Sequence, residues 1–359
     1  MSSLDKLASQ LVERGGSDLH IAAGSPPMMR VDGDLVPYGE EQLTADLARK
    51  LIYEILTKEQ VERFEEDLEL DMSFGIEGLG RFRTNIFMQR NAVGAVLRVI
   101  PQATIPFAEL GLPREACERI CGLGKGLVLV TGATGSGKST TLSSMVDHIN
   151  SSRNEHIMTI EDPIEYIHPN KGCLVNQREV GTDTHGFQNA LRTALRQDPD
   201  IIMVGEIRDQ ETISAALTIA ETGHLTFATL HTNSVVQTVN RVIDVFPAHQ
   251  QAQVRTQLSF TLEAVFCQQL VPREGGRGRV LAAEVLIATP AVRALVREEK
   301  VHQLESVVQT GVRLGMRTMN QSLLDHCGKG RISFKNAMRY SSTPEEIERL
   351  YKKSGGVCV

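Results

Sequence analysis

The chain has 359 residues, 41% of them hydrophobic and 23% charged, a balance typical of a globular protein with two domains. A formal net charge of −6 gives no reason to expect strong attraction to nucleic acid or to anionic lipid. No apolar run approaches the roughly 20 residues of a membrane span, and the first residues show no signal-peptide pattern. We therefore expect a cytoplasmic protein that meets membranes only through partners.

Residues 1–100 predict a small α+β domain. Asp32 and Gly33 form a two-residue turn signal, and Thr44 is a plausible helix N-cap. In chain order, the expected elements are a helix over 4–14, a strand beginning within 15–24, a hairpin over 28–38, one helix over 44–67 and an antiparallel meander over 68–100.

Residues 101–113 contain three prolines and predict a semi-rigid linker. Beyond it, over residues 114–340, strands alternate with helices, which indicates a parallel sheet. Residues 341–359 are interpreted as a C-terminal tail. The expected strands are 126–131, 156–161, 200–205 and 225–231, and the expected helices include 139–150, 187–197 and 211–223. After residue 246 we expect mostly helix, apart from one strand over 279–287.

A phosphate-binding loop follows the first strand of this second domain. The stretch GATGSGKSTT matches the pattern G-x-x-x-x-G-K-[ST], in which glycines let successive backbone N–H groups point at phosphate oxygens. Lys138 is expected to reach the β- and γ-phosphates and Ser139 to ligate Mg²⁺. The predicted nucleotide-binding residues are Gly132, Thr134, Gly135, Ser136, Gly137, Lys138, Ser139 and Thr140.

Carboxylates and histidines stand at the ends of neighbouring predicted strands. Glu206 ends one apolar run, where a water-mediated Mg²⁺ contact would lie, and Glu165 belongs to the acidic stretch TIEDPIEY. A general base for the attacking water, or a metal contact, would give these carboxylates a purpose. His224 and His231 bracket another strand, and each alone is more typical of a structural residue.

The six cysteines include one close pair, Cys117 and Cys121. A structural zinc site needs four ligands, usually two close pairs, so we expect reduced thiols rather than a metal centre.

With these stretches together, the sequence resembles the type II/type IV superfamily of secretion and pilus ATPases, in particular its PilT-like and PilU-like retraction branch. The resemblance runs from residue 15 to about 340. Six motifs carry it in order: GATGSGKSTT, TIEDPIEYIH, NQREVGTDTHGF, LRQDPDIIMVGEIRD, AETGHLTFATLHTN and FPAHQQAQVRTQLS. It implies an α/β fold in which an N-terminal PAS-like α+β domain precedes a RecA-like P-loop ATPase domain with a helical C-terminal region.

The resemblance also implies roles for individual residues. Glu165 would be the catalytic glutamate, Glu206 the acid that holds Mg²⁺ through water, and His224 and His231 the histidine motif. The working unit would be a homo-hexamer. Arginines of the first domain would then add positive charge at ATP as it is split; the candidates are Arg81, Arg83 and Arg98.

Two features favour pilus retraction over pilus extension. By the resemblance, the extension ATPases usually carry a four-cysteine zinc module and an extra N-terminal domain, and we expect neither in this chain. The stretch AVRALVREEK (291–300) is similar to a motif of the retraction branch but departs from it at three positions, among them Ala294 in place of an amide. The resemblance implies an inner-membrane platform protein as partner, a peripheral location at the base of the pilus, and possible pairing with a paralogous retraction or extension ATPase.

Three alternatives stay open on the sequence. An accessory PilU-like paralogue would share nearly all of these motifs. A DNA-transfer ATPase would need basic or aromatic residues along a channel, whereas the chain has no Trp and only 4% aromatic residues, so we expect no nucleic-acid partner. A nucleotide-gated regulator without turnover would not need both Glu165 and Glu206.

Overall fold

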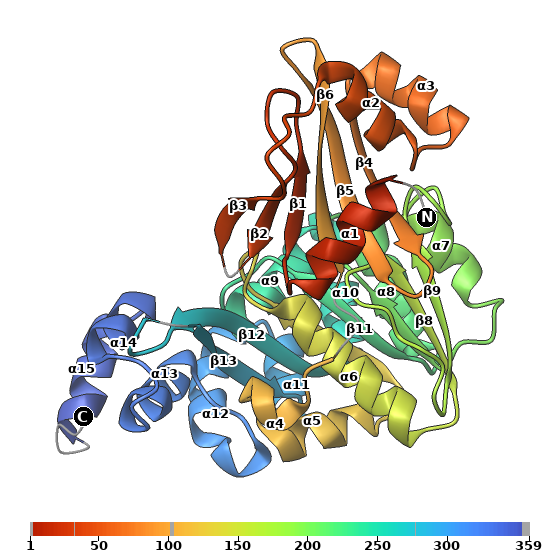
Figure 1. Ribbon diagram of the computed structural model, residues 1–359. Coiled ribbons are helices and arrows are strands. Elements are labelled where there is room, and N and C mark those ends of the chain that lie inside the picture. The colour runs from red at the N-terminus through yellow and green to blue at the C-terminus, as the bar shows by residue number, and fades with distance from the viewer. Residues whose placement is uncertain (1–2, 32, 101–103, 277, 354–359) are drawn as a thin grey trace. The chain divides into compact units, whose positions relative to one another are not determined.

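The computed structural model describes residues 3–31, 33–100, 104–276 and 278–353 (Figure 1). These residues divide into two compact units. The first comprises the described residues up to 100 together with residues 165–167, and the second comprises the rest from Thr104 onwards. Within the described ranges, no helix combines the length and the apolar character needed to span a bilayer.

The first unit is built on a six-stranded antiparallel sheet in the order β3-β2-β1-β6-β5-β4. The predicted hairpin and meander are confirmed, although Asp32 of the turn lies outside the described residues. The elements are α1 (Ser3–Glu13), β1 (Asp18–Ile21), β2 (Met28–Val31), β3 (Asp34–Pro37), α2 (Ala45–Tyr53), α3 (Lys58–Asp67), β4 (Glu69–Ile76), β5 (Gly80–Gln89) and β6 (Ala92–Ile100).

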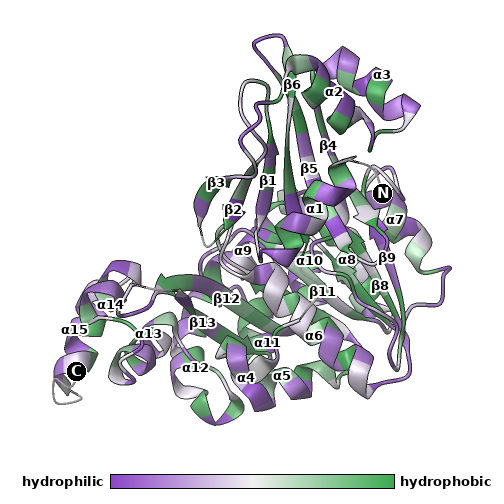
Figure 2. Cartoon of the chain, in the orientation of Figure 1, coloured by the Kyte–Doolittle hydropathy of each residue, from purple (hydrophilic) through white to green (hydrophobic). Residues whose placement is uncertain are grey.

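The two faces of this sheet differ in polarity. Phe82, Ile86 and Leu97 on one face are fully buried and belong to a core that also includes Leu4 and Leu11 of α1. Side chains alternate between the two faces along a strand. The positions of β5 that alternate with the buried ones include Arg81, Arg83 and Asn85, which are polar. The resulting green and purple bands along β5 are visible in Figure 2. The apolar face forms the core, and the opposite face is left with the arginines.

The single helix expected over 44–67 is wrong, because the structure has two helices there. Thr44 caps α2 as predicted, accepting a hydrogen bond from Leu47 N at 3.2 Å. Thr57 then starts α3 with a capping box, in which its hydroxyl accepts from Gln60 N and Gln60 Oε1 accepts from Thr57 N. A second Ser/Thr followed three residues later by Glu or Gln was the missed signal.

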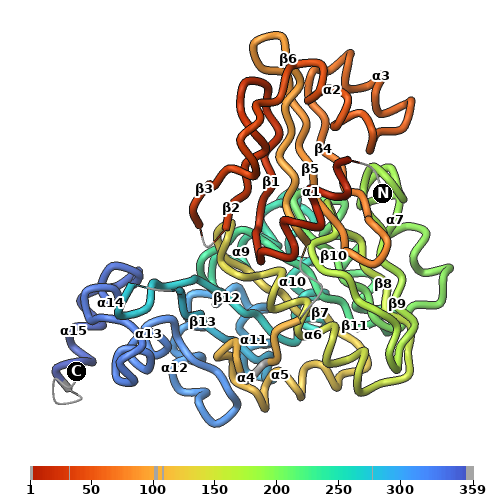
Figure 3. Tube along the Cα trace, viewed as in Figure 1, coloured from red at the N-terminus to blue at the C-terminus, as the bar shows by residue number. Residues whose placement is uncertain are grey.

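The second unit is built on a seven-stranded sheet in the order β13-β12-β7-β11-β10-β8-β9. All neighbouring strands are parallel except β12 and β13. Figure 3 shows by colour that β12 and β13, late in the sequence, lie together at one end of this sheet. The strands are β7 (Gly126–Thr131), β8 (His156–Glu161), β9 (Leu174–Glu179), β10 (Ile201–Val204), β11 (Leu225–Leu230), β12 (Leu262–Pro272) and β13 (Arg279–Ile287).

Helices connect and flank these strands. They are α4 (Phe107–Leu110), α5 (Arg114–Cys121), α6 (Lys138–Ser152), α7 (Phe187–Ala194), α8 (Gln210–Glu221), α9 (Val235–Asp244), α10 (Ala248–Thr261), α11 (Pro290–Arg297), α12 (Leu304–Thr310), α13 (Met319–Gly328), α14 (Phe334–Tyr340) and α15 (Pro344–Lys353), with short 3₁₀ turns at Val301–Gln303 and Val312–Leu314.

Four elements differ from expectation. β12 begins directly after α10 and is almost wholly buried, so it shows neither a turn signal nor alternation. β9 was missed because its run of apolar residues is too short. The expected linker contains α4, and its residues 101–103 lie outside the described residues. The expected tail contains α15, whose Ile347 is fully buried, and its residues 354–359 are not described.

The expectation of reduced thiols holds for four of the cysteines. Cys117, Cys121, Cys173 and Cys267 are free and buried. Cys327 is disulfide-bonded, so the expectation is wrong there. Within the described part of the chain, no group of three His, Cys, Asp or Glu side chains is arranged to hold a metal ion.

Candidate nucleotide-binding site

The predicted phosphate-binding loop connects the carboxyl end of β7 to α6. Gly132, Gly135 and Gly137 have φ angles of 144°, 76° and 92°, a region that favours glycine. A Cβ atom on Gly132 would lie 2.3 Å from the Gln268 carbonyl oxygen and 2.5 Å from Ser136 Oγ. The loop therefore needs glycine at its first position for space as well as for conformation.

The start of α6 offers donors to an anion. Its N-cap is Gly137, which has no side chain of its own to cap the first amide groups of the helix. Ser139 and Thr140 lie half-buried in the first turn, and the buried Ser136 hydroxyl has no hydrogen-bond partner among the described residues. Thr134 is at the exposed tip of the loop. These donors fit phosphate, and the Ser139 oxygen fits a hard cation such as Mg²⁺.

Lys138 lies over the same loop. Its ammonium donates to the carbonyl oxygens of Gly132 at 2.9 Å and Ala133 at 3.2 Å. Its charge also contributes to lowering the pKa of Glu206, which follows β10. The cation and the carboxylate predicted to share a nucleotide are therefore electrostatic neighbours.

Glu206 is held by the side chains of Arg208 and His231. Arg208 Nε donates to its Oε1 and Arg208 Nη2 to its Oε2, both at 2.7 Å, and His231 Nε2 lies 2.9 Å from Oε1. The hydrogen bonds from Arg208 hold the pKa of Glu206 below its usual value, against the opposing effect of partial burial. Glu206 is thus a carboxylate at neutral pH. Arg208 was assigned no role from the sequence, although it lies only two residues after Glu206.

The acidic stretch after β8 reaches the same edge of the sheet. Glu161 is buried and accepts hydrogen bonds from Thr159 Oγ1 at 2.7 Å and Gln177 Nε2 at 3.2 Å. The charge of Asp162 adds to that of Glu206 in raising the pKa of Arg208, so Asp162 is also near. Glu165 is exposed in the loop that follows, and its catalytic role stays a prediction.

The two histidines of the predicted histidine motif lie at opposite ends of β11. His231 follows the carboxyl end, beside Glu206. His224 precedes the amino end, where its Nδ1 lies 3.1 Å from the Ile219 carbonyl oxygen. The six residues of β11 lie between the two, so seven steps of about 3.3 Å separate them by about 23 Å. A catalytic role for His224 at this chain's own phosphate-binding loop is therefore not supported.

The three predicted arginines lie on the polar face of the first unit's sheet. Arg83 on β5 is directly opposite Arg98 on β6. Arg98 Nε donates to the buried Asp18 at 2.7 Å, and Arg81 donates to Ser73 Oγ at 2.6 Å. No hydrogen bond or ion pair to Arg83 occurs among the described residues. Like charges directly opposite one another destabilise a strand pair, so this arrangement favours an anion-binding use.

A cavity of about 350 Å³ adjoins the start of α6. Gly137 and Thr140 contribute to its lining from the phosphate-binding loop, which places the cavity next to the predicted phosphates. Its other lining residues are mostly apolar or arginine and come from the segment before α5, from β12 and β13, and from the loop after α13: Ile105, Glu109, Leu110, Gly111, Thr141, Leu270, Arg273, Arg279, Val280, Leu281 and Arg331.

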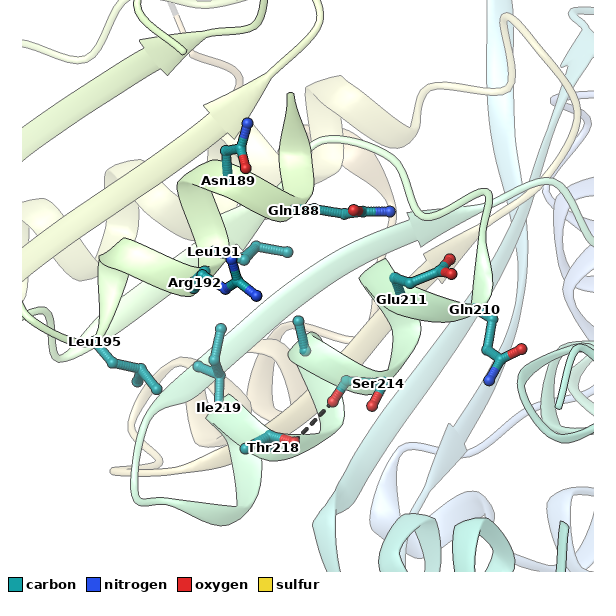
Figure 4. A pocket seen from close by; sticks show the side chains of 11 residues that line it. Gln188, Asn189, Leu191, Arg192, Leu195, Gln210, Glu211, Ser214, Thr218 and Ile219 are labelled. Carbon is teal, nitrogen blue, oxygen red and sulfur yellow. Dashed lines mark hydrogen bonds between the residues drawn. The ribbon is translucent and has the colours of Figure 1, made fainter. Parts of the chain in front are cut away.

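A larger cavity, of about 530 Å³, lies between α7 and α8 (Figure 4). Leu191, Leu195 and Ile219 give it an apolar end, and Gln188 and Glu211 line it where both helices begin. None of the predicted site residues lines it, so it is separate from the phosphate-binding loop.

The chain belongs to the family of type II/IV secretion system proteins, whose model matches residues 1–339. The expected fold class, an α+β domain followed by an α/β P-loop domain with a helical C-terminal region, is confirmed by this match and by likeness to a solved structure. That structure, the pilus retraction motor PilT with bound ADP, has a TM-score of 0.90 and 47% sequence identity, covering 97% of this chain and 99% of the other.

Two curated relatives from Pseudomonas aeruginosa are similar over nearly the full length. The type IV pilus retraction ATPase PilT is 52% identical, covering 96% of this chain and 99% of its own. The type IV pilus ATPase PilU is 42% identical, covering 97% of this chain and 91% of its own.

Proposed function

We propose that this chain is a magnesium-dependent ATPase motor that powers retraction of type IV pili. The observation that carries the proposal is the meeting of Lys138, Glu206 and His231 at one edge of the parallel sheet, beside a glycine loop that leads into the start of α6. The similarity to a retraction ATPase over almost the whole chain supports the coupling to pili.

Each residue of the site has a role in this proposal. Lys138 and the amides at the start of α6 bind the β- and γ-phosphates. Ser139 and, through water, Glu206 would hold Mg²⁺, which would neutralise phosphate charge when bound. Glu165 orients and deprotonates the attacking water. His231 and Arg208 fix the carboxylate of Glu206 in place.

The cavity of about 350 Å³ takes the base and ribose of ATP. Its apolar side chains, Ile105, Leu110, Leu270 and Leu281, suit the faces of an aromatic base. The position of Thr140 at its edge connects this cavity to the phosphate-binding loop.

The working unit in this proposal is a homo-hexamer, in which Arg81, Arg83 and Arg98 add positive charge at the γ-phosphate. An arginine supplied in this way is worth about 10³–10⁵ in rate in other phosphoryl-transfer enzymes. The motor would lie at the cytoplasmic side of the inner membrane, on a platform protein at the base of the pilus, and nucleic acid would have no part in its cycle.

The test is genetic and enzymatic. Deleting the gene should leave surface fibres in place while abolishing surface motility, and the wild-type gene, but not a Lys138→Ala version, should restore motility. Purified protein should hydrolyse ATP at the same rate with and without single-stranded DNA. Strong stimulation by DNA, or loss of the fibres themselves, would contradict the proposal.

An accessory PilU-like role is a second candidate, favoured by Ala294 in a motif that carries an amide in the retraction branch. In that case, deletion should weaken motility without abolishing it. The higher identity to PilT than to PilU supports the principal motor.

A further inference from the structure

Arg317 has a half-buried guanidinium without a counter-ion among the described residues. It lies just before α13, and no carboxylate of the described residues is within ion-pair distance of it. Burial lowers its pKa, and the more distant charges of Asp325 and Cys117 act in the opposite direction. A buried charge is costly unless it is hydrogen-bonded, so its partners indicate what it is for.

Those partners are two backbone carbonyl groups from separate segments. Arg317 Nη2 donates to the Gly111 carbonyl at 3.0 Å, and Arg317 Nε donates to the Ala283 carbonyl at 3.1 Å. Gly111 ends α4 and itself lines the cavity beside the phosphate-binding loop. Ala283 is on β13, two residues after the lining residue Leu281. One side chain therefore joins two of the segments that line that cavity.

The wall from Ile105 to Gly111 is fixed at its other end too. Ser144 of α6 donates a hydrogen bond to the Ile105 carbonyl. Hence the segment is tied to the helix of the phosphate-binding loop at its start and to β13 at its end. The β13 wall has its own support, since His326 Nε2 lies 2.8 Å from the Leu281 carbonyl oxygen.

We propose that Arg317 is a positioning residue that sets the width of the nucleoside cavity by clamping Gly111 to β13. The inference rests on the proposed function, because it takes this cavity as the site of the base and ribose. Arg317 touches neither base nor phosphate. Its loss would leave two buried carbonyls unpaired and let the wall from Ile105 to Gly111 move away from Leu281, while the phosphate-binding loop keeps its shape.

The test compares a ligand that has a nucleoside with one that has none. Binding of ADP and of inorganic tripolyphosphate, each with Mg²⁺, is measured by titration calorimetry on the full chain and on Arg317→Met. We expect the variant to bind ADP about tenfold more weakly, the effect of about one lost hydrogen-bonded contact. Its affinity for tripolyphosphate should stay within about twofold. In Arg317→Met, the KM for ATP should rise by about the same factor by which the affinity for ADP falls, and kcat should change little.

Arg119→Met is the matched control. Arg119 also donates to a carbonyl in this region, that of Leu314 at 2.9 Å, but neither residue lines the cavity. It should leave both affinities unchanged. Arg317→Lys keeps the charge and one donor direction, so its affinity for ADP should lie between those of wild type and Arg317→Met. This variant replaces Arg317→Met in the test if the methionine variant does not fold.

Two results would overturn the inference: equal loss of affinity for ADP and tripolyphosphate, or unchanged ADP affinity in both Arg317 variants. Failure of the proposed function gives a different result, because the wild-type chain would then bind neither ligand.

Discussion

The two sheets of this chain present their polar residues differently. In the antiparallel sheet of the first unit, Arg83 and Arg98 lie in mid-strand and face each other across β5 and β6. In the largely parallel sheet of the second unit, β10 and β11 are buried on both faces, and Glu206 and His231 follow the strand ends. Polar candidate residues therefore lie along one face of the first sheet, but only at the carboxyl edge of the second.

The comparison extends to the two ends of a single strand. His231 and His224 belong to one sequence motif, yet only His231 reaches Glu206. Membership of a motif is therefore weaker evidence for a shared site than position at one edge of a parallel sheet.

The largest expected effect comes from the carboxyl edge itself. Lys138→Ala should lower ATP hydrolysis by at least about 10³-fold and should also weaken nucleotide binding, because the phosphates lose their main charge partner. Glu165→Ala should lower hydrolysis by at least about 10²-fold but leave nucleotide binding nearly intact, as expected of a general base. Phosphate release and ADP titration measure the two quantities.

Lys125→Ala, an exposed lysine before β7, is the control and should behave as wild type. Equal loss of nucleotide binding in the Lys138 and Glu165 variants would contradict the separate roles.

The next largest effect is expected at Arg83, on the sheet of the first unit. Arg83→Ala should lower turnover by about 10²-fold or more if the side chain supplies charge to ATP as it is split. Its effect on the free energy of unfolding should stay within about 0.5 kcal/mol, because Arg83 is exposed and its removal relieves repulsion from Arg98. Turnover and urea unfolding are measured on the same preparations.

Arg98→Ala is the informative counterpart, since it leaves the buried Asp18 without its ion pair and should destabilise the first unit as well. Arg30→Ala, on the same face, should keep wild-type turnover. If Arg83→Ala assembles normally and keeps full turnover, Arg83 does not contribute to hydrolysis, and the catalytic residues lie in the parallel sheet alone.

Substitution of the two histidines should change turnover by smaller factors than substitution of Arg83. His231→Asn should lower turnover by about 10–100-fold, the usual cost of removing a group that orients a metal-binding or catalytic carboxylate. His224→Asn should stay within roughly threefold of wild type, because its ring hydrogen-bonds at the amino edge of the sheet. Similar losses in both would mean that His224 acts at a nucleotide after all.

The smallest effect on turnover is expected at Glu284, whose carboxylate accepts a hydrogen bond from Val235 N at 2.8 Å. Burial raises the pKa of Glu284 to about 7 from an ordinary value of 4.5. The folded chain therefore binds a proton there that the unfolded chain has released, so stability is full below about pH 4.5 and falls as pH rises through 7. The loss should approach about 3 kcal/mol.

Glu284→Gln keeps an acceptor for Val235 and removes the titration. Urea unfolding at pH 5.5 and pH 8 should therefore show a smaller fall in stability for the variant than for wild type. The same fall in both proteins would show that Glu284 does not titrate in this range.

Much of the fold and of the candidate site could be predicted from the sequence, for physical reasons. The glycine spacing of the phosphate-binding loop and the alternation of β5 are local patterns, so they can be read without a partner. β12 could not be found in this way, since a strand buried on both faces lacks alternation. The partnership of His231 with Glu206, and the bonds of Arg317 to Gly111 and Ala283, join distant segments and become visible only in the folded chain.

The measurement that tests the account most directly is release of inorganic phosphate from ATP by the purified wild-type chain, with Mg²⁺ and then with EDTA. The account predicts steady release with Mg²⁺, none with EDTA, and none in either condition for Lys138→Ala. A folded, assembled wild-type chain that binds ATP but releases no phosphate would contradict it.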